Sequence, residues 1–304
     1  MDGWDGSGGW LRCALHAHTT GSDGELSPEA LCRHYARAGY DVLAITDHWR
    51  RSEPEDDGGL LVLPSVELNC MLPGGRDGHV LGFGVEAAPD ELAALGAEYA
   101  DLARTGEWVV EHGGVAYLAH PYWTGVTPGT LALPESVTGV EVFNAGCELE
   151  VGRGLSSVHW DELLEAGRRC HAIATDDSHH PGFDSDFAWT WLRVEECTTA
   201  AVLGALAAGE LYASTGPRIE ALRVEEGTVE VRCDPCRSVT LLTGRTRGAA
   251  VHAGRLGYRH GGDVLETAGG GVVRARLVAP EPALYGRLEL VDLDGRKAWS
   301  NVLW

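Results

Sequence analysis

Histidines and carboxylates with the spacing of metal ligands lie close to short apolar segments. His16 and His18 end the apolar run that begins at Leu11. Alternation along an extended strand points residues i and i+2 to the same side, so both imidazoles can bind one cation. Further acidic and imidazole groups follow along the chain at Asp23, His48, Glu67, His79, His120, Asp177 and His179. This set exceeds what a single ion can use, so the sequence predicts a site for several divalent ions.

The elements that must position these residues form an alternating pattern. Strands are expected at residues 11–16, 42–46, 61–66, 79–84, 115–119, 139–143 and 171–175. Helices are expected after Ser27, with Pro28 at the first helical position, and at residues 90–112, 156–168 and 198–209. Such alternation favours a parallel sheet, and about seven units would close into a barrel. Loops at the carboxyl ends of barrel strands meet at one mouth, where most of the candidate ligands fall.

The composition changes after Ala213. Runs that alternate apolar and polar residues follow, for example at 228–232 and 272–278, separated by Gly, Pro and Asp. These runs are typical of antiparallel strands in a small sandwich. We therefore expect an α/β domain at residues 1–213 and a β-sandwich domain at residues 214–304.

Composition restricts the partners. The formal charge of −21 in 304 residues repels polyanions, so long nucleic acid is not an expected partner. No apolar run is long enough to span a bilayer, and the first residues do not form a secretory signal. We expect a cytoplasmic protein without a membrane partner that acts on a small molecule.

The eight cysteines lack the regular spacing of a disulfide framework, so most are expected to be reduced and buried. Cys233 and Cys236 have C-x-x-C form, which would suit a redox or zinc site. No second pair completes a four-thiolate zinc site, so function there is not expected.

Several short motifs occur in a specific order, namely L-H-A-H-T-T-x-S-D-G, A-I-T-D-H, S-V-E, G-H-V-L-G, A-H-P, E-V-F-N and D-D-S-H. Over roughly residues 11–213, the chain thereby resembles the PHP (polymerase and histidinol phosphatase) family of metallohydrolases. The resemblance implies a distorted (β/α)7 barrel, here followed by the small antiparallel β-sandwich domain, and up to three divalent ions. It implies a first ion on His16, His18, Glu67 and Asp177. It also implies a second ion on Glu67, His79 and His120, and a third on Asp23, His48 and His179.

Closely spaced cations can lower the pKa of a bridging water and neutralise charge on the oxygens of a phosphoryl group. Mixed nitrogen and oxygen ligands suit zinc, manganese or iron, and the sequence does not choose among them. We expect a hydrolase that attacks a small phosphate ester with a metal-bound hydroxide. His180 is a candidate acid for the leaving group. Asn144 could bond a substrate or a ligand, or form a strand-to-helix turn, and Asp47 could orient a neighbouring ligand.

Two alternatives remain. The stretch at residues 211–219 and the short strands after it are similar to PHP proteins of the CehA/McbA type, which include hydrolases of carbamate esters. Hydrolysis of a carbamate or carboxylic ester is therefore an alternative, because metal hydroxide can attack a carbonyl as well as a phosphoryl group. The other alternative is a non-catalytic module in which metals stabilise the barrel, although all nine ligand positions are filled here.

Overall fold

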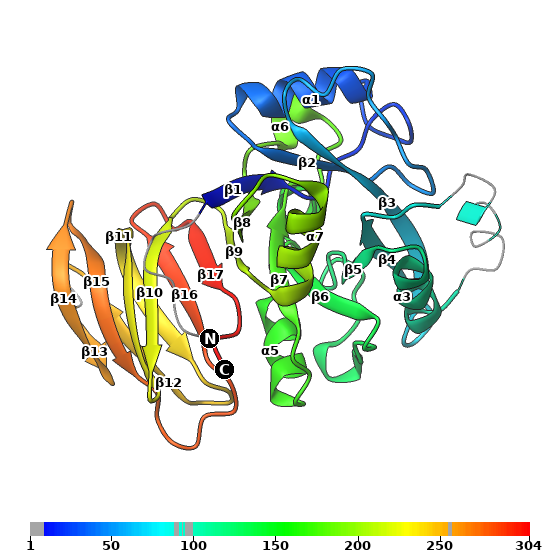
Figure 1. Cartoon of the computed structure of the whole chain (residues 1–304). Coiled ribbons are helices and arrows are strands. Elements are labelled where there is room, and N and C mark those ends of the chain that lie inside the picture. Colours follow the sequence, from blue (N-terminus) through cyan, green and yellow to red (C-terminus); the bar gives the residue numbers. More distant parts are fainter. Residues whose placement is uncertain (1–8, 88–90, 93, 95–99, 255–256) are drawn as a thin grey trace. The chain divides into compact units, whose positions relative to one another are not determined.

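The computed structural model divides into two compact units, which are described separately (Figure 1). The first contains Gly9–Leu163 and Cys170–Leu211, and the second contains Leu164–Arg169 and Tyr212–Trp304. The expected domains at residues 1–213 and 214–304 stay predictions. The structure describes residues 9–87, 91–92, 94, 100–254 and 257–304.

The first unit is a mixed α/β structure, as predicted. The β1–β2, β2–β3, β5–β6 and β6–β7 pairs are parallel, whereas β3–β4, β4–β5 and β1–β8 are antiparallel. Short parallel bridges outside the strands also join Ala17 to Ser178 and His48 to Glu67. The strands are β1 (Gly9–Ala14), β2 (Val42–Ile45), β3 (Leu61–Leu72), β4 (Arg76–Phe83), β5 (Val115–Leu118), β6 (Val137–Asn144), β7 (His171–Thr175) and β8 (Trp189–Val194).

The expectation of a parallel sheet is wrong at β4, which runs antiparallel to both of its neighbours. A tight turn joins β3 to β4 in place of a crossover helix, and Gly74 and Gly75 in that turn have φ values of 80° and 70°. Antiparallel strands can be joined in this way, but parallel strands cannot. The hairpin extends β3 to Leu72, and this places residues of both strands beside the predicted site. Closure of the sheet into a barrel stays a prediction.

Helices cover the strands of this unit. Ser27 caps α1 as predicted, because its hydroxyl accepts a hydrogen bond from the Ala30 amide. Part of the helix predicted at 90–112 lies outside the described residues, and the described helix begins at Leu102. In the described part of the chain, no helix is long and apolar enough to cross a membrane. The helices are α1 (Pro28–Arg37), α3 (Leu102–Glu111), the 3-10 turn η1 (Pro128–Thr130), α4 (Ala145–Val151), α5 (Ser157–Glu165), α6 (Pro181–Asp184) and α7 (Thr199–Ala208).

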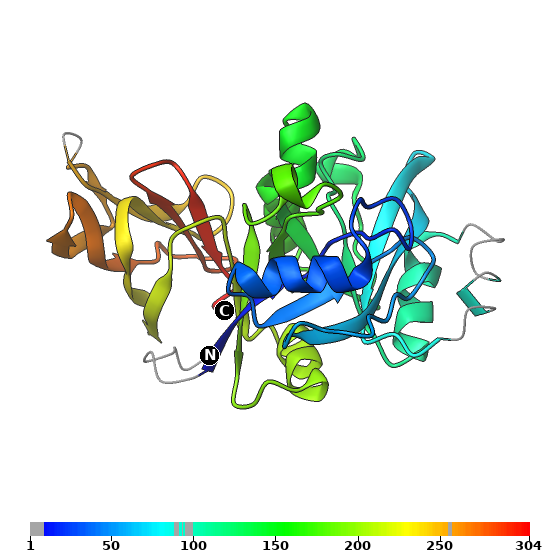
Figure 2. The ribbon, with the colours of Figure 1, turned by 90° about the horizontal axis from the view of Figure 1, so that it is seen from above.

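Strand β2 is buried on both faces, which is typical of a strand between two apolar layers. Leu43 and Ile45 pack in one cluster with Leu31 and Tyr35 of α1, which lies along this face (Figure 2). The alternate residues of β2 belong to a second cluster with side chains of β1, β4, β5 and α7. The strand ends that carry the candidate ligands are therefore fixed by packing on both sides.

The second unit consists of antiparallel pairs. The long strand β11 pairs first with β10 and β15, and beyond Cys236 it pairs with β12 and β16. Cys233 and Cys236 are buried at this irregular point, and all eight cysteines of the chain are free thiols. Assembly of these pairs into a two-sheet sandwich stays a prediction. The strands are β9 (Leu211–Ser214), β10 (Ile219–Glu225), β11 (Thr228–Leu242), β12 (Gly248–His252), β13 (Arg259–His260), β14 (Gly262–Ala268), β15 (Gly271–Val278), β16 (Arg287–Asp292) and β17 (Lys297–Ser300).

Candidate metal centre

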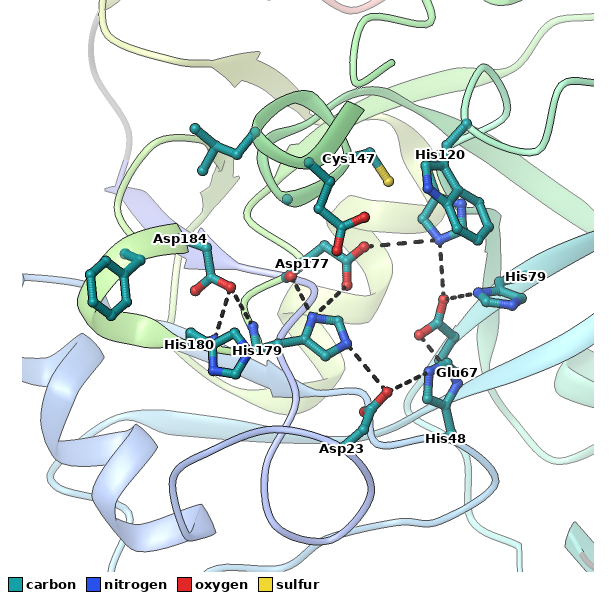
Figure 3. Close-up of a pocket in the computed structure, with 15 residues that line it drawn as sticks. Asp23, His48, Glu67, His79, His120, Cys147, Asp177, His179, His180 and Asp184 are labelled. Atoms are coloured by element: carbon teal, nitrogen blue, oxygen red, sulfur yellow. Dashed lines mark hydrogen bonds and ion pairs between the residues drawn. The ribbon is translucent and has the colours of Figure 1, made fainter. Parts of the chain in front are cut away.

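The nine predicted ligands converge in the first unit. His16 and His18 follow β1, and Asp177 follows β7. Backbone hydrogen bonds tie the two segments, because the Asp177 amide donates to the His16 carbonyl at 3.0 Å and the His18 amide donates to the Ser178 carbonyl at 2.9 Å. Figure 3 shows that Glu67, His79 and the other labelled candidates face one cavity from several strands.

Glu67 lies at the centre of this arrangement and is 1% exposed. Its Oε2 is 3.1 Å from Nε2 of both His16 and His18. Its Oε1 is 2.8 Å from Nδ1 of His79 and 3.4 Å from Nε2 of His120. Oε2 also lies 3.5 Å from Nδ1 of His48. The two oxygens thus face different imidazoles, and one carboxylate could serve two neighbouring cations.

The candidates form three overlapping groups of donors, each with atoms within 4.8 Å of one another, and Glu67 belongs to two of them. Asp177 completes the first, since its Oδ1 is 3.1 Å from Nε2 of His16 and 3.2 Å from Nε2 of His18. His120 stands beside them, with Nε2 4.0 Å from Asp177 Oδ2. The groups are His16, His18, Glu67 and Asp177; His48, Glu67 and His79; and His18, Asp23, His48 and His179.

The most exposed of the nine side chains is Asp23, which lies in the turn after His18. Its Oδ2 is 3.6 Å from Nε2 of His48 and 3.5 Å from Nε2 of His179. Asp47 supports this turn, because it accepts hydrogen bonds from the Thr19 amide at 2.7 Å and the Ser22 hydroxyl at 2.8 Å. Asp47 therefore helps to position the loop that carries Asp23.

The donor set fits divalent cations. His18 Nε2, His48 Nδ1 and Asp177 Oδ1 are among the buried side-chain atoms of the described residues that make no hydrogen bond, although His18 Nε2 lies at ion-pair distance from Glu67 and Asp177. Buried polar atoms are nearly always paired, and an unpaired one calls for an explanation. All three atoms belong to residues of the donor groups, and cations bound among them would satisfy these lone pairs.

Two of the candidates have unusual backbone conformations. His120 and Asp177 have φ values of 29° and 54°, in the left-handed region that residues other than glycine rarely adopt. The His120 amide donates to Glu141 Oε2 at 2.8 Å, and this hydrogen bond helps to hold the conformation. Strain of this kind is concentrated at functional sites, where the surrounding structure maintains it.

The charges of the site are strongly coupled. Burial alone would lower the pKa of His16, but the carboxylates of Asp177, Glu67 and Glu141 outweigh it and hold that pKa well above its usual value. The same competition, with Asp177 and Glu67, raises the pKa of His18 to about 9. Burial opposes ionisation of Glu67 and Asp177, yet the histidines lower both pKa values. The carboxylates thus favour positive charge here, which protons or metal ions can supply.

Glu141 in β6 was missed by the sequence analysis. It is 0% exposed and accepts hydrogen bonds from Nδ1 of His16 at 2.8 Å, from the Thr175 hydroxyl, and from Nδ2 of Asn144 at 2.9 Å. The proton on His16 Nδ1 leaves the Nε2 lone pair facing Glu67 and Asp177. A single charge inside an apolar strand was the available signal, since a buried carboxylate requires partners.

Asn144 both contacts a ligand candidate and forms the strand-to-helix turn. Nδ2 donates to Asp177 Oδ2 at 3.1 Å, whereas Oδ1 accepts from the Cys147 amide and caps α4. It is fully buried and is not among the described residues that line the cavity, so its contact is with a ligand candidate. His180 does line the cavity, with an exposed ring whose Nδ1 is 3.5 Å from Oε2 of Glu25. Its role as an acid stays a prediction.

No protein-family model matches the chain, and no curated protein matches it. A two-domain protein from Bacteroides vulgatus, described as containing a predicted PHP-like metal-dependent phosphoesterase, has a similar structure. The identity is 17% and the TM-score 0.56, over 95% of this chain and 92% of that one. The chain has a PHP-like fold.

Two further structures are similar to parts of this PHP-like chain. An amidohydrolase from Chromobacterium violaceum is 20% identical, with a TM-score of 0.41 over 57% of this chain and 89% of that one. A lesion-specific endonuclease from Pyrococcus furiosus is 12% identical, with a TM-score of 0.45 over 66% of this chain and 56% of that one. At these scores neither likeness bears on the activity of the PHP-like unit.

Proposed function

We propose that this PHP-like chain is a metal-dependent hydrolase that cleaves a small phosphate ester. The overlap of three donor groups at the wall of one cavity, two of which contain Glu67, carries the proposal. We assign two or three divalent ions to it, of zinc, manganese or iron. The proposed ligands are His16, His18, Asp23, His48, Glu67, His79, His120, Asp177 and His179.

Bound divalent ions would lower the pKa of a coordinated water and neutralise charge on the reacting oxygens. The residues of the chain prepare this chemistry. Glu141 orients the His16 ring, and Asn144 orients Asp177 through a hydrogen bond of 3.1 Å. His180 directs Nδ1 toward Glu25, so its Nε2 is the atom that would give a proton to the leaving oxygen.

A direct assay separates the phosphoesterase from the two alternatives. The full chain is loaded with Mn²⁺, Zn²⁺ or Fe²⁺ and given p-nitrophenyl phosphate or p-nitrophenyl acetate. We expect release of nitrophenol from the phosphate, lost on chelation and in His18→Ala. Turnover of the acetate alone would replace the proposal with a carboxylic ester hydrolase. Metal binding without turnover of either compound would support a binding module.

The proposed substrate is a small molecule. The expected absence of nucleic acid and membrane partners and the cytoplasmic location stay predictions. DNA is the control for the expected absence of a nucleic-acid partner, which rests on the formal charge of −21. Single- and double-stranded oligonucleotides belong in the same assay, and metal-dependent cleavage of either would contradict the small-molecule proposal.

A further inference from the structure

The cavity continues beyond the proposed ligands. Its volume is about 620 Å³, within the ~300–1,000 Å³ range of small-molecule sites. The part without ligand candidates is formed by α4, by α6 and by the turn after β5. Figure 3 shows Cys147 and His180, from two of these segments, on the same cavity as the ligand candidates.

Large apolar side chains line this outer part. Leu149 on α4 is 56% exposed, Phe183 on α6 is 81% exposed, and Trp123 after β5 is 37% exposed. Trp123 also contacts the ligand candidates, since its ring centroid is 5.0 Å from that of His120. Exposed apolar side chains around a cavity mark binding surfaces, because a ligand that covers them removes apolar area from water.

The outer part carries no permanent positive charge. None of the described residues that line the cavity is an arginine or a lysine. Asp184 is already occupied, because it accepts hydrogen bonds from the Ser178 hydroxyl and the amides of His179 and His180. The Glu150 side chain makes no hydrogen bond or ion pair with any described residue, so its carboxylate is available to repel a second anionic group.

Cationic groups nearby do not change this balance. Arg153 lies after α4, with its guanidinium carbon 5.6 Å from the centroid of the Tyr122 ring, and it is not among the described residues that line the cavity. A substrate that carries a second phosphate or a carboxylate would therefore meet Glu150 without an arginine or lysine side chain to offset it.

We propose that this outer part is the subsite for the leaving group, and that it selects phosphate monoesters of uncharged, apolar alcohols with an aryl group. The inference rests on the proposed phosphoesterase activity. The phosphate lies toward the ligand candidates, while the aryl group packs against Leu149, Phe183 and Trp123. Hydrolysis adds water across the P–O bond and yields the alcohol and inorganic phosphate.

The test compares benzyl, methyl and 4-carboxybenzyl phosphate with the metal-loaded full chain. Benzyl and methyl alcohol have similar acidity, so a difference in kcat/KM reports binding of the ring. Burial of a phenyl ring predicts a kcat/KM about tenfold or more higher for benzyl than for methyl phosphate. We expect 4-carboxybenzyl phosphate to be cleaved less efficiently than benzyl phosphate, and Glu150→Gln to reduce that difference.

Phe183→Ala and Leu149→Ala should each reduce the preference for benzyl over methyl phosphate. The matched controls are Phe187→Ala and Val151→Ala, at exposed positions that are not among the described residues lining the cavity, and they should preserve it. Equal kcat/KM values for benzyl and methyl phosphate in the wild type would overturn the subsite. A preference that persists in both cavity variants would do the same.

Binding without turnover separates this inference from the proposed function. Calorimetry with benzylphosphonate and methylphosphonate measures the same ring contact on the metal-loaded protein. Tighter binding of benzylphosphonate, weakened by Phe183→Ala, supports the subsite even if no phosphate ester is cleaved, in which case only the phosphoesterase proposal fails. Equal affinities for the two phosphonates would overturn the subsite itself.

Discussion

Replacement of Glu141 by Gln tests how the chain orients its proposed ligands. The carboxylate accepts from His16 Nδ1 and the Thr175 hydroxyl at Oε1, and from the His120 amide and Asn144 Nδ2 at Oε2. A glutamine amide has the same shape but must place its NH₂ group at one of these two positions. In either placement, the NH₂ group faces N–H or O–H donors whose hydrogen bonds the carboxylate oxygen accepted.

The two placements are not equivalent. At the Oε2 position, the NH₂ group would face the His120 amide, which can only donate. At the Oε1 position, it would face Thr175, whose hydroxyl can rotate, and His16, whose ring can move its proton from Nδ1 to Nε2. The second placement is favoured, and it puts the His16 proton on the nitrogen that faces Glu67 and Asp177. His16 Nε2 then no longer presents a lone pair to a metal ion.

We therefore expect Glu141→Gln to weaken metal binding by about 10–100-fold, which corresponds to about 1.4–2.8 kcal/mol. Competition with a chromophoric chelator measures the affinity. Glu162→Gln, at an exposed position on α5, is the matched control and should bind as the wild type does. Circular dichroism of the metal-free variants checks that both are folded. Wild-type affinity in a folded Glu141→Gln protein would refute the proposed orientation of His16.

Three further predictions concern protons, stability and the turn after His18. Metal affinity should rise by at least about tenfold per pH unit between pH 7 and 9. A proton must leave His18, whose pKa near 9 reflects burial outweighed by Asp177 and Glu67, and the raised pKa of His16 adds to this dependence. A chelator titration that is flat over this range would contradict it. Ser27→Ala should lower the free energy of unfolding in urea by about 0.5–2 kcal/mol through loss of the α1 cap, while metal affinity stays at the wild-type value. Asp47→Asn should weaken metal binding, because the Thr19 amide and the Ser22 hydroxyl lose a charged acceptor; unchanged calorimetric titrations would show that Asp47 does not position the turn.

The sequence predicted the convergence of the nine side chains because their spacing reflects strand geometry. His16 and His18 are two residues apart at the end of a strand, and Asp177 follows a buried apolar run. The spacing of these residues along a strand is local, so it places them in the same way once the chain has folded. Glu141 could not be assigned in this way, because its partners lie on segments far away in sequence and only folding brings them together.

Topology was less predictable from local patterns. The Pro73-Gly74-Gly75 stretch marks a turn, but an apolar run before it and another after it fit either a hairpin or two separate parallel strands. The helices α4 and α6 were missed because each is too short to show a clear period. These two helices line the cavity beside the ligand candidates, so the selectivity of the site depends on elements that periodicity does not reveal.

Side chains from distant segments are proposed to bind divalent ions around Glu67. Crystals of the full chain grown with Mn²⁺ and measured above and below the manganese absorption edge would locate these ions. We expect anomalous peaks within bonding distance of Glu67 and of His16, His18 or His79. Anomalous peaks only elsewhere on the protein, or no peaks at saturating Mn²⁺, would contradict this proposal.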